Sequence, residues 1–208
     1  MEFLRRAILL LAASSWIVSG DAQAQRPIPS GPIREGTLSF DGHATTGDFT
    51  GTTTTVTGEM TGGAELASVR GWVEAPVQSL VTGNGKRDRD LNKSMESGKY
   101  PTIRYELVAV VPGEVRGDTL TGTLHGYFLI HGVRQDAAIP ATVLLLDDGI
   151  RVWGETPLDL KSYKIGGLSK MLGMLKMHEE ILVHVDLTFG SVPAGGTPAP
   201  IGVAGSSR

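Results

Sequence analysis

Five histidines are the residues of this chain best suited to chemistry, because the chain contains no cysteine. Imidazole binds metal ions and transfers protons near neutral pH. Two of the histidines have carboxylates beside them in the sequence: His43 follows Asp41, and His178 precedes Glu179 and Glu180. These two neighbourhoods are the candidates for a metal site or an acid–base pair.

The positions of the other histidines favour a surface role. No two histidines have the close spacing, such as His-x3-His, that brings two ligands to one metal ion. His125 and His184 fall on the polar faces of predicted strands, and His131 falls in a predicted turn. We therefore favour surface histidines, with a hydrolase or metal-binding protein that depends on His43 as an alternative.

Composition excludes several classes of function. Without cysteine the chain has no thiol catalysis, no disulfide framework and no cysteine-ligated metal. Its formal net charge is −3, and it has no basic cluster, which gives no reason to expect a nucleic-acid partner. It also lacks a serine-nucleophile motif, a phosphate-binding loop and a dinucleotide-binding glycine motif. The sequence thus predicts a protein that is not an enzyme, with no catalytic residue, metal or cofactor.

Polar and apolar residues alternate with a period of two along most of the chain, as they do in strands with one dry face and one wet face. The clearest run is 119–130, whose apolar face carries Leu120, Leu124 and Phe128. A turn at His131-Gly132 leads into a second strand, and Asp147-Asp148-Gly149 makes a hairpin turn into a third. These three strands form an antiparallel meander.

The whole pattern favours an all-β fold of eight antiparallel strands closed into a barrel, since closure removes exposed sheet edges. A two-sheet sandwich is the second choice. A short helix is expected at 87–97, between the third and fourth strands, where Leu91 and Met95 are four residues apart. A helical or loop segment, 158–178, precedes the last strand. The eight strands are predicted at 37–43, 49–57, 66–77, 102–111, 119–130, 133–145, 150–154 and 182–189, with a turn at 58–63. On 102–111 the residues predicted to face inward are Ile103, Tyr105, Leu107, Ala109 and Val111.

The N-terminal 24 residues resemble an export signal. Arg5-Arg6 precedes an apolar stretch, Ala7 to Val18, and Ala22-Gln23-Ala24 fits the small-x-small cleavage pattern. The apolar stretch is shorter than the ~20 residues of a membrane-spanning helix, which disfavours an anchor. We expect the mature chain to begin at Gln25 and to reach the periplasm or the cell exterior.

The mature chain is expected to have three parts. Residues 25–35 contain three prolines and are predicted to form an extended leader, and residues 36–189 form the barrel domain. Residues 190–208 are rich in glycine, alanine, proline and serine and are predicted to be a disordered tail.

Small residues are frequent on the predicted inner faces. An eight-stranded barrel either fills with side chains or holds one small ligand. Small inner residues leave room and favour a ligand cavity, whereas glycines that only bend strands would fit a solid barrel acting as a structural or interaction module. The small inner residues are Gly42, Gly51, Gly71, Gly122, Gly126, Gly154, Ala75, Ala109, Ala137 and Ala141.

The segment from Ile165 to Met177 is the candidate for the cavity mouth. It contains Met171, Met174 and Met177, half of the six methionines of the chain. Methionine adapts to irregular apolar shapes and is common at binding surfaces, although it also fills gaps in ordinary cores.

Four stretches resemble the YceI-like family: GTLSFDGHATTGDFTG (36–51), VEAPVQSLVTGNGKRDRDLNKSMESGKYPTIRYEL (73–107), GYFLIHGVRQDAAIPATV (126–143) and LKSYKIGGL (160–168). The most specific pieces are the Asp-Leu-Asn helix that leads to Tyr-Pro-Thr-Ile-Arg-Tyr, and the Ile-His-Gly-Val turn. The chain departs from the usual pattern of the family at Arg134, where threonine is common, and before the late loop, where it has Leu160, Ser162, Tyr163 and Lys164.

The resemblance implies an exported lipocalin-like barrel that holds a polyisoprenoid or other long-chain lipid in an apolar tunnel for transport, storage or sequestration. Transient membrane contact, for which Trp72 and Trp153 on predicted outer faces are the candidates, and a homodimer are both left open. The residues expected to line the tunnel and its mouth are Phe40, Phe49, Val73, Ile103, Tyr105, Leu107, Leu124, Phe128, Ile130, Val143, Tyr163, Ile165, Leu168, Met171, Leu172, Met174, Leu175 and Val185.

Overall fold

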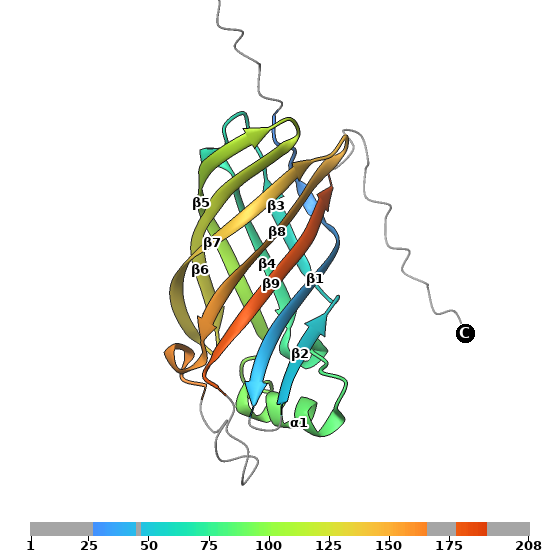
Figure 1. Cartoon of the computed structure of the whole chain (residues 1–208), viewed down its shortest axis with the longest axis vertical. Helices are drawn as coiled ribbons and strands as arrows, with labels where there is room; N and C mark the ends of the chain where they lie inside the picture. The colour runs from blue at the N-terminus through green and yellow to red at the C-terminus, as the bar shows by residue number, and fades with distance from the viewer. Residues whose placement is uncertain (1–26, 45–46, 166–177, 191–208) are drawn as a thin grey trace, which may run out of the picture.

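The computed structural model describes residues 27–44, 47–165 and 178–190, and most of them lie in strands (Figure 1). One α-helix, α1 (Gly85–Ser94), and three short 3-10 helices complete the described structure: η1 (Leu66–Ser68), η2 (Val77–Ser79) and η3 (Leu160–Tyr163). The nine strands are β1 (Gly31–Ala44), β2 (Gly47–Thr53), β3 (Thr57–Thr61), β4 (Arg70–Pro76), β5 (Thr102–Arg116), β6 (Thr119–Ile130), β7 (Val133–Leu145), β8 (Gly149–Asp159) and β9 (Glu180–Gly190).

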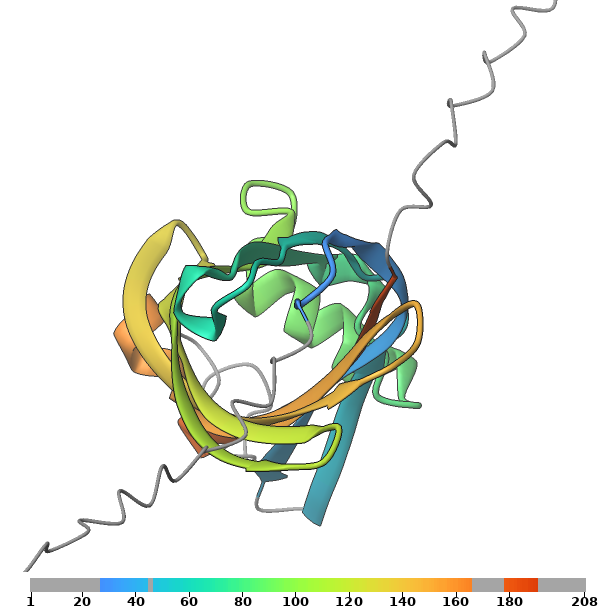
Figure 2. The same ribbon diagram turned by 90° about the horizontal axis from the view of Figure 1, so that it is seen from above.

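Eight of the strands close into an antiparallel barrel. β3 to β9 pair in chain order, and β1 completes the ring by pairing with β9 on one side and β3 on the other. Seen from above, the strands encircle the interior (Figure 2). The predicted barrel is therefore confirmed, and the two-sheet sandwich is wrong because β1 and β9 leave no open edge between two sheets.

One more strand is present than the eight predicted. It arises in residues 49–63, which are predicted to form one strand and a turn. The predicted strand 49–57 is divided between β2 and β3, and β3 occupies much of the predicted turn at 58–63. The Thr53 hydroxyl accepts a hydrogen bond from the Thr55 backbone N–H at 3.0 Å, which bends the chain between the two strands. β2 then pairs with one part of β1, and β3 with another.

β1 begins earlier than expected. Residues 31–35, predicted as the end of an extended leader, lie in β1, where Pro32 pairs with Glu59 of β3. Proline is tolerated near a strand end, where it does not need to donate to the ladder. Ile28, further upstream, is 8% exposed and forms a bridge with Gly63. This part of the predicted leader therefore belongs to the barrel.

α1 lies across one end of the barrel (Figure 1). It begins two residues before the predicted helix because Asn84 caps it: the Asn84 side chain accepts hydrogen bonds from the backbone N–H groups of Lys86 and Arg87. Leu91 and Met95, on one face of the helix, pack into the core at this end. In the described structure, no helix is both long and apolar enough to cross a membrane.

A bulge in β5 changes which residues of this strand face inward, so one part of the predicted inner face is wrong. The pairing with β6 shifts between Leu107 and Ala109, so the alternation reverses beyond that point. Val110 is therefore buried, whereas Val111, predicted to face inward, is 53% exposed, and Ala109 loses its inward place.

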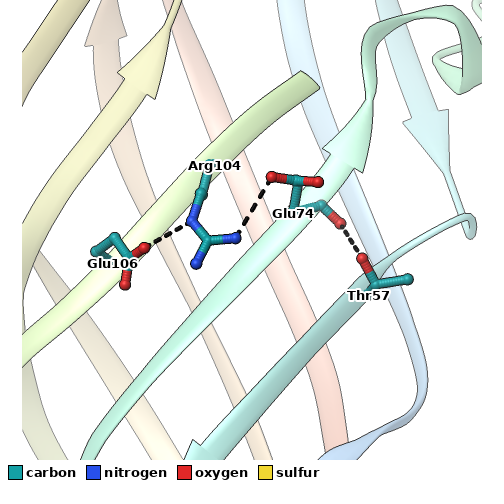
Figure 3. A network of polar contacts seen from close by, with 4 residues as sticks. All are labelled: Thr57, Glu74, Arg104 and Glu106. Carbon is teal, nitrogen blue, oxygen red and sulfur yellow. Dashed lines mark hydrogen bonds and ion pairs between the residues drawn. The ribbon is translucent and has the colours of Figure 1, made fainter. Parts of the chain in front are cut away.

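The outer surface of the wall is polar where the inner surface is apolar. Arg104 of β5 donates to Glu106 at 2.6 Å and to Glu74 of β4 at 3.4 Å, and the Thr57 hydroxyl donates to the Glu74 carbonyl at 3.5 Å (Figure 3). The Arg104 guanidinium also lies 4.2 Å from the centre of the Trp72 ring. Since Ile103 and Tyr105 face the core on either side, this arrangement keeps the charges of the strand outside the barrel.

Candidate ligand-binding cavity

A cavity of about 210 Å³ occupies the interior of the barrel. All nine strands and α1 contribute residues to its wall. The volume is below the ~300–1,000 Å³ of pockets that enclose drug-sized ligands. A narrow chain therefore suits this cavity better than a compact polycyclic ligand does.

The cavity is long for its volume. Ile181, Val183, Val185, Leu187 and Phe189 all line it, so it follows β9 for most of the strand. Eight residue steps at ~3.3 Å span roughly 26 Å along the strand, or about 20 Å along the barrel axis at the usual strand tilt.

Two apolar clusters surround the cavity, one toward each end. The first lies against α1 and η3 and includes Met95, Leu160 and Ile165. The second, toward the opposite end, includes Ile28, Met60 and Phe189, and Leu107 and Leu124 contact both clusters. The apolar wall is thus continuous from one end to the other.

Most of the predicted tunnel residues lie on this wall. Phe49 and Tyr163 do not: the Phe49 ring packs edge-on against Phe40 with centroids 6.1 Å apart, and Tyr163 is buried in the cluster beside η3. Leu168, Met171, Leu172, Met174 and Leu175 lie outside the described residues. The predicted residues that line the cavity are Phe40, Val73, Ile103, Tyr105, Leu107, Leu124, Phe128, Ile130, Val143, Ile165 and Val185.

The sequence suggests that the inward glycines leave room for a ligand, but only some of them do. A side chain at Gly51 would lie 2.3 Å from the Phe40 ring, and one at Gly126 would lie 2.8 Å from the Tyr105 ring and 2.0 Å from the Glu106 carbonyl oxygen. These glycines give space to aromatic rings that cover them. Gly71, Gly154 and the small side chains of Ala75 and Ala141 do line the cavity.

Some residues of the cavity wall are not predicted, because their segments show no clear alternation of polar and apolar residues. Ile28 lies in the predicted leader and Met60 in the predicted turn, yet both are buried and line the cavity. Leu91 and Met95 of the helical segment also line it, and their four-residue spacing is the signal that could have assigned them to the wall.

The tyrosine hydroxyl in the cavity wall is paired. The Tyr105 hydroxyl donates to the Leu124 carbonyl at 3.0 Å, and burial raises the pKa of Tyr105 well above its ordinary value. Burial also raises the pKa of Tyr163 to about 12. The two phenols therefore stay neutral at physiological pH, and neither adds a charge to the interior.

The histidine candidates for chemistry lie outside the cavity. The candidate partners Asp41 and His43 are not hydrogen-bonded to each other: the Asp41 carboxylate accepts from Thr50 at 2.7 Å and contacts His184 Nε2 at 2.8 Å, and these hydrogen bonds lower the pKa of Asp41. His43 instead contacts Asp48 at 2.8 Å.

The second candidate neighbourhood meets the first, since the His178 and His43 rings lie edge to face with centroids 6.2 Å apart. The His178 backbone N–H donates to the His43 carbonyl, while Glu179 forms an ion pair with Lys161. Within 27–44, 47–165 and 178–190, no three His, Asp or Glu side chains are placed to hold a metal ion.

Comparisons with known proteins place this geometry in a family. The model of the YceI-like domain matches residues 34–189, which is more than half of the chain. No curated protein matches the chain.

Solved structures share the fold. The Burkholderia cenocepacia protein BcnA is 14% identical, with a TM-score of 0.62 over 74% of this chain and 95% of its own. A structure described as a polyisoprenoid binding domain from Saccharophagus degradans, implicated in plant cell wall breakdown, is also 14% identical, with a TM-score of 0.67 over 79% of this chain and 99% of its own.

Proposed function

The chain belongs to the YceI-like family, and from that premise we propose that it is an exported protein that holds a polyisoprenoid or a similar long apolar chain inside its barrel. The observation that carries the proposal is the cavity: it is narrow, it follows the barrel for about 20 Å, and its wall is made almost entirely of aliphatic and aromatic side chains.

The shape and chemistry of this wall favour a chain-like lipid over other ligands. A sugar, nucleotide or amino acid would lose its hydrogen bonds to water and find few partners inside, at a cost of several kcal/mol for each unpaired group. A hydrocarbon chain loses nothing of this kind. The ligand named in the description of the Saccharophagus degradans domain, a polyisoprenoid, has this character and supports the choice of ligand class.

Burial of methylene groups is sufficient to explain binding. Each buried methylene contributes about 0.8 kcal/mol before the costs of association. After those costs, a ligand of this size gains about 0.3 kcal/mol for each non-hydrogen atom. A chain of several isoprene units thus binds without any ion pair, and the proposal needs no catalytic group.

The proposed place of action is the periplasm or the cell exterior. Arg5-Arg6, the apolar stretch behind it and the Ala22-Gln23-Ala24 motif support export. There the protein carries, stores or sequesters its lipid, and transient contact with a membrane serves for loading.

The test is the identification of the ligand in protein purified from its own host. After gentle extraction, native mass spectrometry is expected to show a bound apolar molecule, and organic extraction followed by mass spectrometry identifies it. Emptied protein is then titrated with tritiated geranylgeraniol. If several gentle preparations contain no lipid and the emptied protein does not bind geranylgeraniol, the proposal is wrong, and a non-catalytic structural or interaction barrel is the better description.

A further inference from the structure

Three residues other than glycine have positive φ angles in the described part of the chain: Glu96 (45°), His131 (53°) and Lys164 (59°). They belong to three separate loops, yet all three meet at the α1 end of the barrel. His131 contacts Glu96 directly, and it also contacts Tyr163, the residue before Lys164. Non-glycine residues adopt this backbone conformation at a cost, and such residues gather at functional places.

Each of the three residues is next to one that lines the cavity. Met95 precedes Glu96, Ile130 precedes His131, and Ile165 follows Lys164, and all three neighbours are cavity-wall residues. The backbone at these positions therefore determines where the wall stands at this end of the barrel.

His131 connects the three loops through its side chain, which is 9% exposed. Its Nδ1 lies 3.1 Å from the Tyr163 carbonyl oxygen. Because a carbonyl only accepts hydrogen bonds, Nδ1 carries a proton and donates it. The imidazole also packs against the Tyr100 ring, with centroids 4.5 Å apart.

The other ring nitrogen has no hydrogen bond. Nε2 of His131 is buried and lies 3.5 Å from the Glu96 carboxylate, close enough for attraction between charges but without the geometry of a hydrogen bond. In the neutral imidazole, Nε2 is an acceptor that faces another acceptor. In the imidazolium, Nε2 becomes a donor and is able to bond the carboxylate while Nδ1 keeps its bond to Tyr163.

We propose that His131 is a positioning residue that holds the three loops together at this end of the lipid cavity, an arrangement called the clasp below. Protonation of His131 adds a bond to the clasp and slows the release of the bound chain. The inference rests on the proposed function, because it concerns the exchange of the same ligand. It assigns to His131 a regulatory role in addition to its place in the β6–β7 turn.

The charged and titratable groups around His131 are compatible with this role. From the loop after α1, Glu96 faces Nε2, and Tyr100 covers the ring. Lys99 lies 3.9 Å from Glu96 and 4.8 Å from the centre of the Tyr100 ring. From η3, the group that faces His131 is the Tyr163 carbonyl. Histidine is the side chain whose charge ordinarily changes between pH 5 and 8, so these pH values are the conditions at which the proposed bond to Glu96 is tested.

The experiment measures the release of tritiated geranylgeraniol from preloaded protein at pH 5.5 and pH 8, because this alcohol does not titrate in that interval. A charge-assisted hydrogen bond is worth about a tenfold change in an equilibrium. We therefore expect wild-type protein to release the probe roughly tenfold more slowly at pH 5.5 than at pH 8.

Two variants test the mechanism. His131→Asn tolerates the positive φ angle but does not titrate, so its release rate is expected to be the same at both pH values. Glu96→Gln can donate its amide N–H to the neutral imidazole, so its release is expected to be slow at both. His125→Asn and His184→Asn, which remove histidines from the outer face, are controls that keep the wild-type ratio.

The outcomes separate this inference from the proposed function. Equal release rates for the wild type at the two pH values, or a wild-type ratio in either clasp variant, overturn the clasp while lipid binding stands. If geranylgeraniol does not bind at all, the proposed function fails, and hydrogen exchange in the empty protein decides about the clasp. The Lys164 and Ile165 amides donate to carbonyls of η3, and their protection factors should be higher at pH 5.5 than at pH 8. Equal protection factors at the two pH values would refute the clasp.

Discussion

Replacement of Ala141 by phenylalanine should divide the cavity in the middle. Ala141 lies in a row of small inward residues, since it pairs with Gly122 of β6 and Gly154 of β8. Gly154 in turn pairs with Val185, the midpoint of the five residues of β9 that line the cavity. A phenyl ring at this level projects into the space that an apolar chain would occupy.

The expected loss of affinity follows from the length of cavity that remains on each side of the ring. A ring at the midpoint leaves about 10 Å of the roughly 20 Å cavity on each side. An isoprenoid alcohol with ~20 non-hydrogen atoms gains about 6 kcal/mol on binding at ~0.3 kcal/mol per atom. Loss of half of this contact costs about 3 kcal/mol, which corresponds to a Kd increased roughly 100-fold.

The assay is equilibrium binding of tritiated geranylgeraniol to Ala141→Phe, compared with Thr142→Phe. Thr142 is the next residue of β7 and points to the outer face, so its replacement adds the same ring outside the barrel and should leave the Kd within about threefold of wild type. Circular dichroism and thermal unfolding establish that both variants are folded. A folded Ala141→Phe protein with wild-type affinity would refute the placement of the ligand along the barrel axis.

Four further predictions concern stability and export. Tyr105→Phe should lower the free energy of unfolding by about 1–2 kcal/mol, measured by urea denaturation, because the Leu124 carbonyl loses its donor while the cavity stays apolar and lipid binding is retained. The pKa of Tyr163 is about 12 in the folded protein against ~10 when unfolded, so the unfolded chain loses this proton first. Tyr163 should therefore lower the stability by up to about 1.4 kcal/mol per pH unit between pH 10 and 12, and Tyr163→Phe should remove this part of the alkaline slope and leave the part that comes from Tyr105. Gly126→Ala should prevent stable folding, detected by loss of the cooperative thermal transition, because its Cβ would lie 2.0 Å from a backbone oxygen of β5. N-terminal sequencing of the exported protein should give Gln25 as the first residue.

Each of these predictions has an outcome that contradicts it. An unchanged urea midpoint for Tyr105→Phe would show that the Leu124 carbonyl has another donor. An alkaline slope as steep in Tyr163→Phe as in the wild type would contradict the raised pKa of Tyr163. A Gly126→Ala protein as stable as the wild type would contradict the close approach of Gly126 to the Glu106 carbonyl oxygen. A mature chain that still contains Arg5-Arg6 would contradict cleavage of an export signal.

The sequence predicts most of the barrel wall because alternation is a local signal. Along β6, β7 and β9 the burial of one side of the strand produces strict alternation, and residues such as Leu124, Val143 and Val185 line the cavity as expected. Ile103, Tyr105 and Leu107 of β5 lie on the wall for the same reason.

The errors arise where distant partners decide the structure. Nothing local in TGEMT indicates that Met60 is buried, because its strand is defined by pairing with β1 and β4. The bulge beyond Leu107 likewise depends on the register of β6. The aromatic rings that cover Gly51 and Gly126 come from neighbouring strands, so a glycine alone cannot show whether it opens a cavity or seats a ring.

The unequal pairing around the ring determines where the wall is weakest. β6 and β7 pair without interruption from Thr119–Leu144 to Ile130–Val133, whereas β1 and β3 pair only at Gly31–Met60 and Pro32–Glu59, and proline offers no N–H to that junction. The junction between β1 and β3 is thus the weakest of the barrel. Upon heating, or under a pulling force, we expect β1 and β3 to separate before any other pair of neighbouring strands. A covalent cross-link between β1 and β3 should therefore stabilise the barrel more than one between β6 and β7.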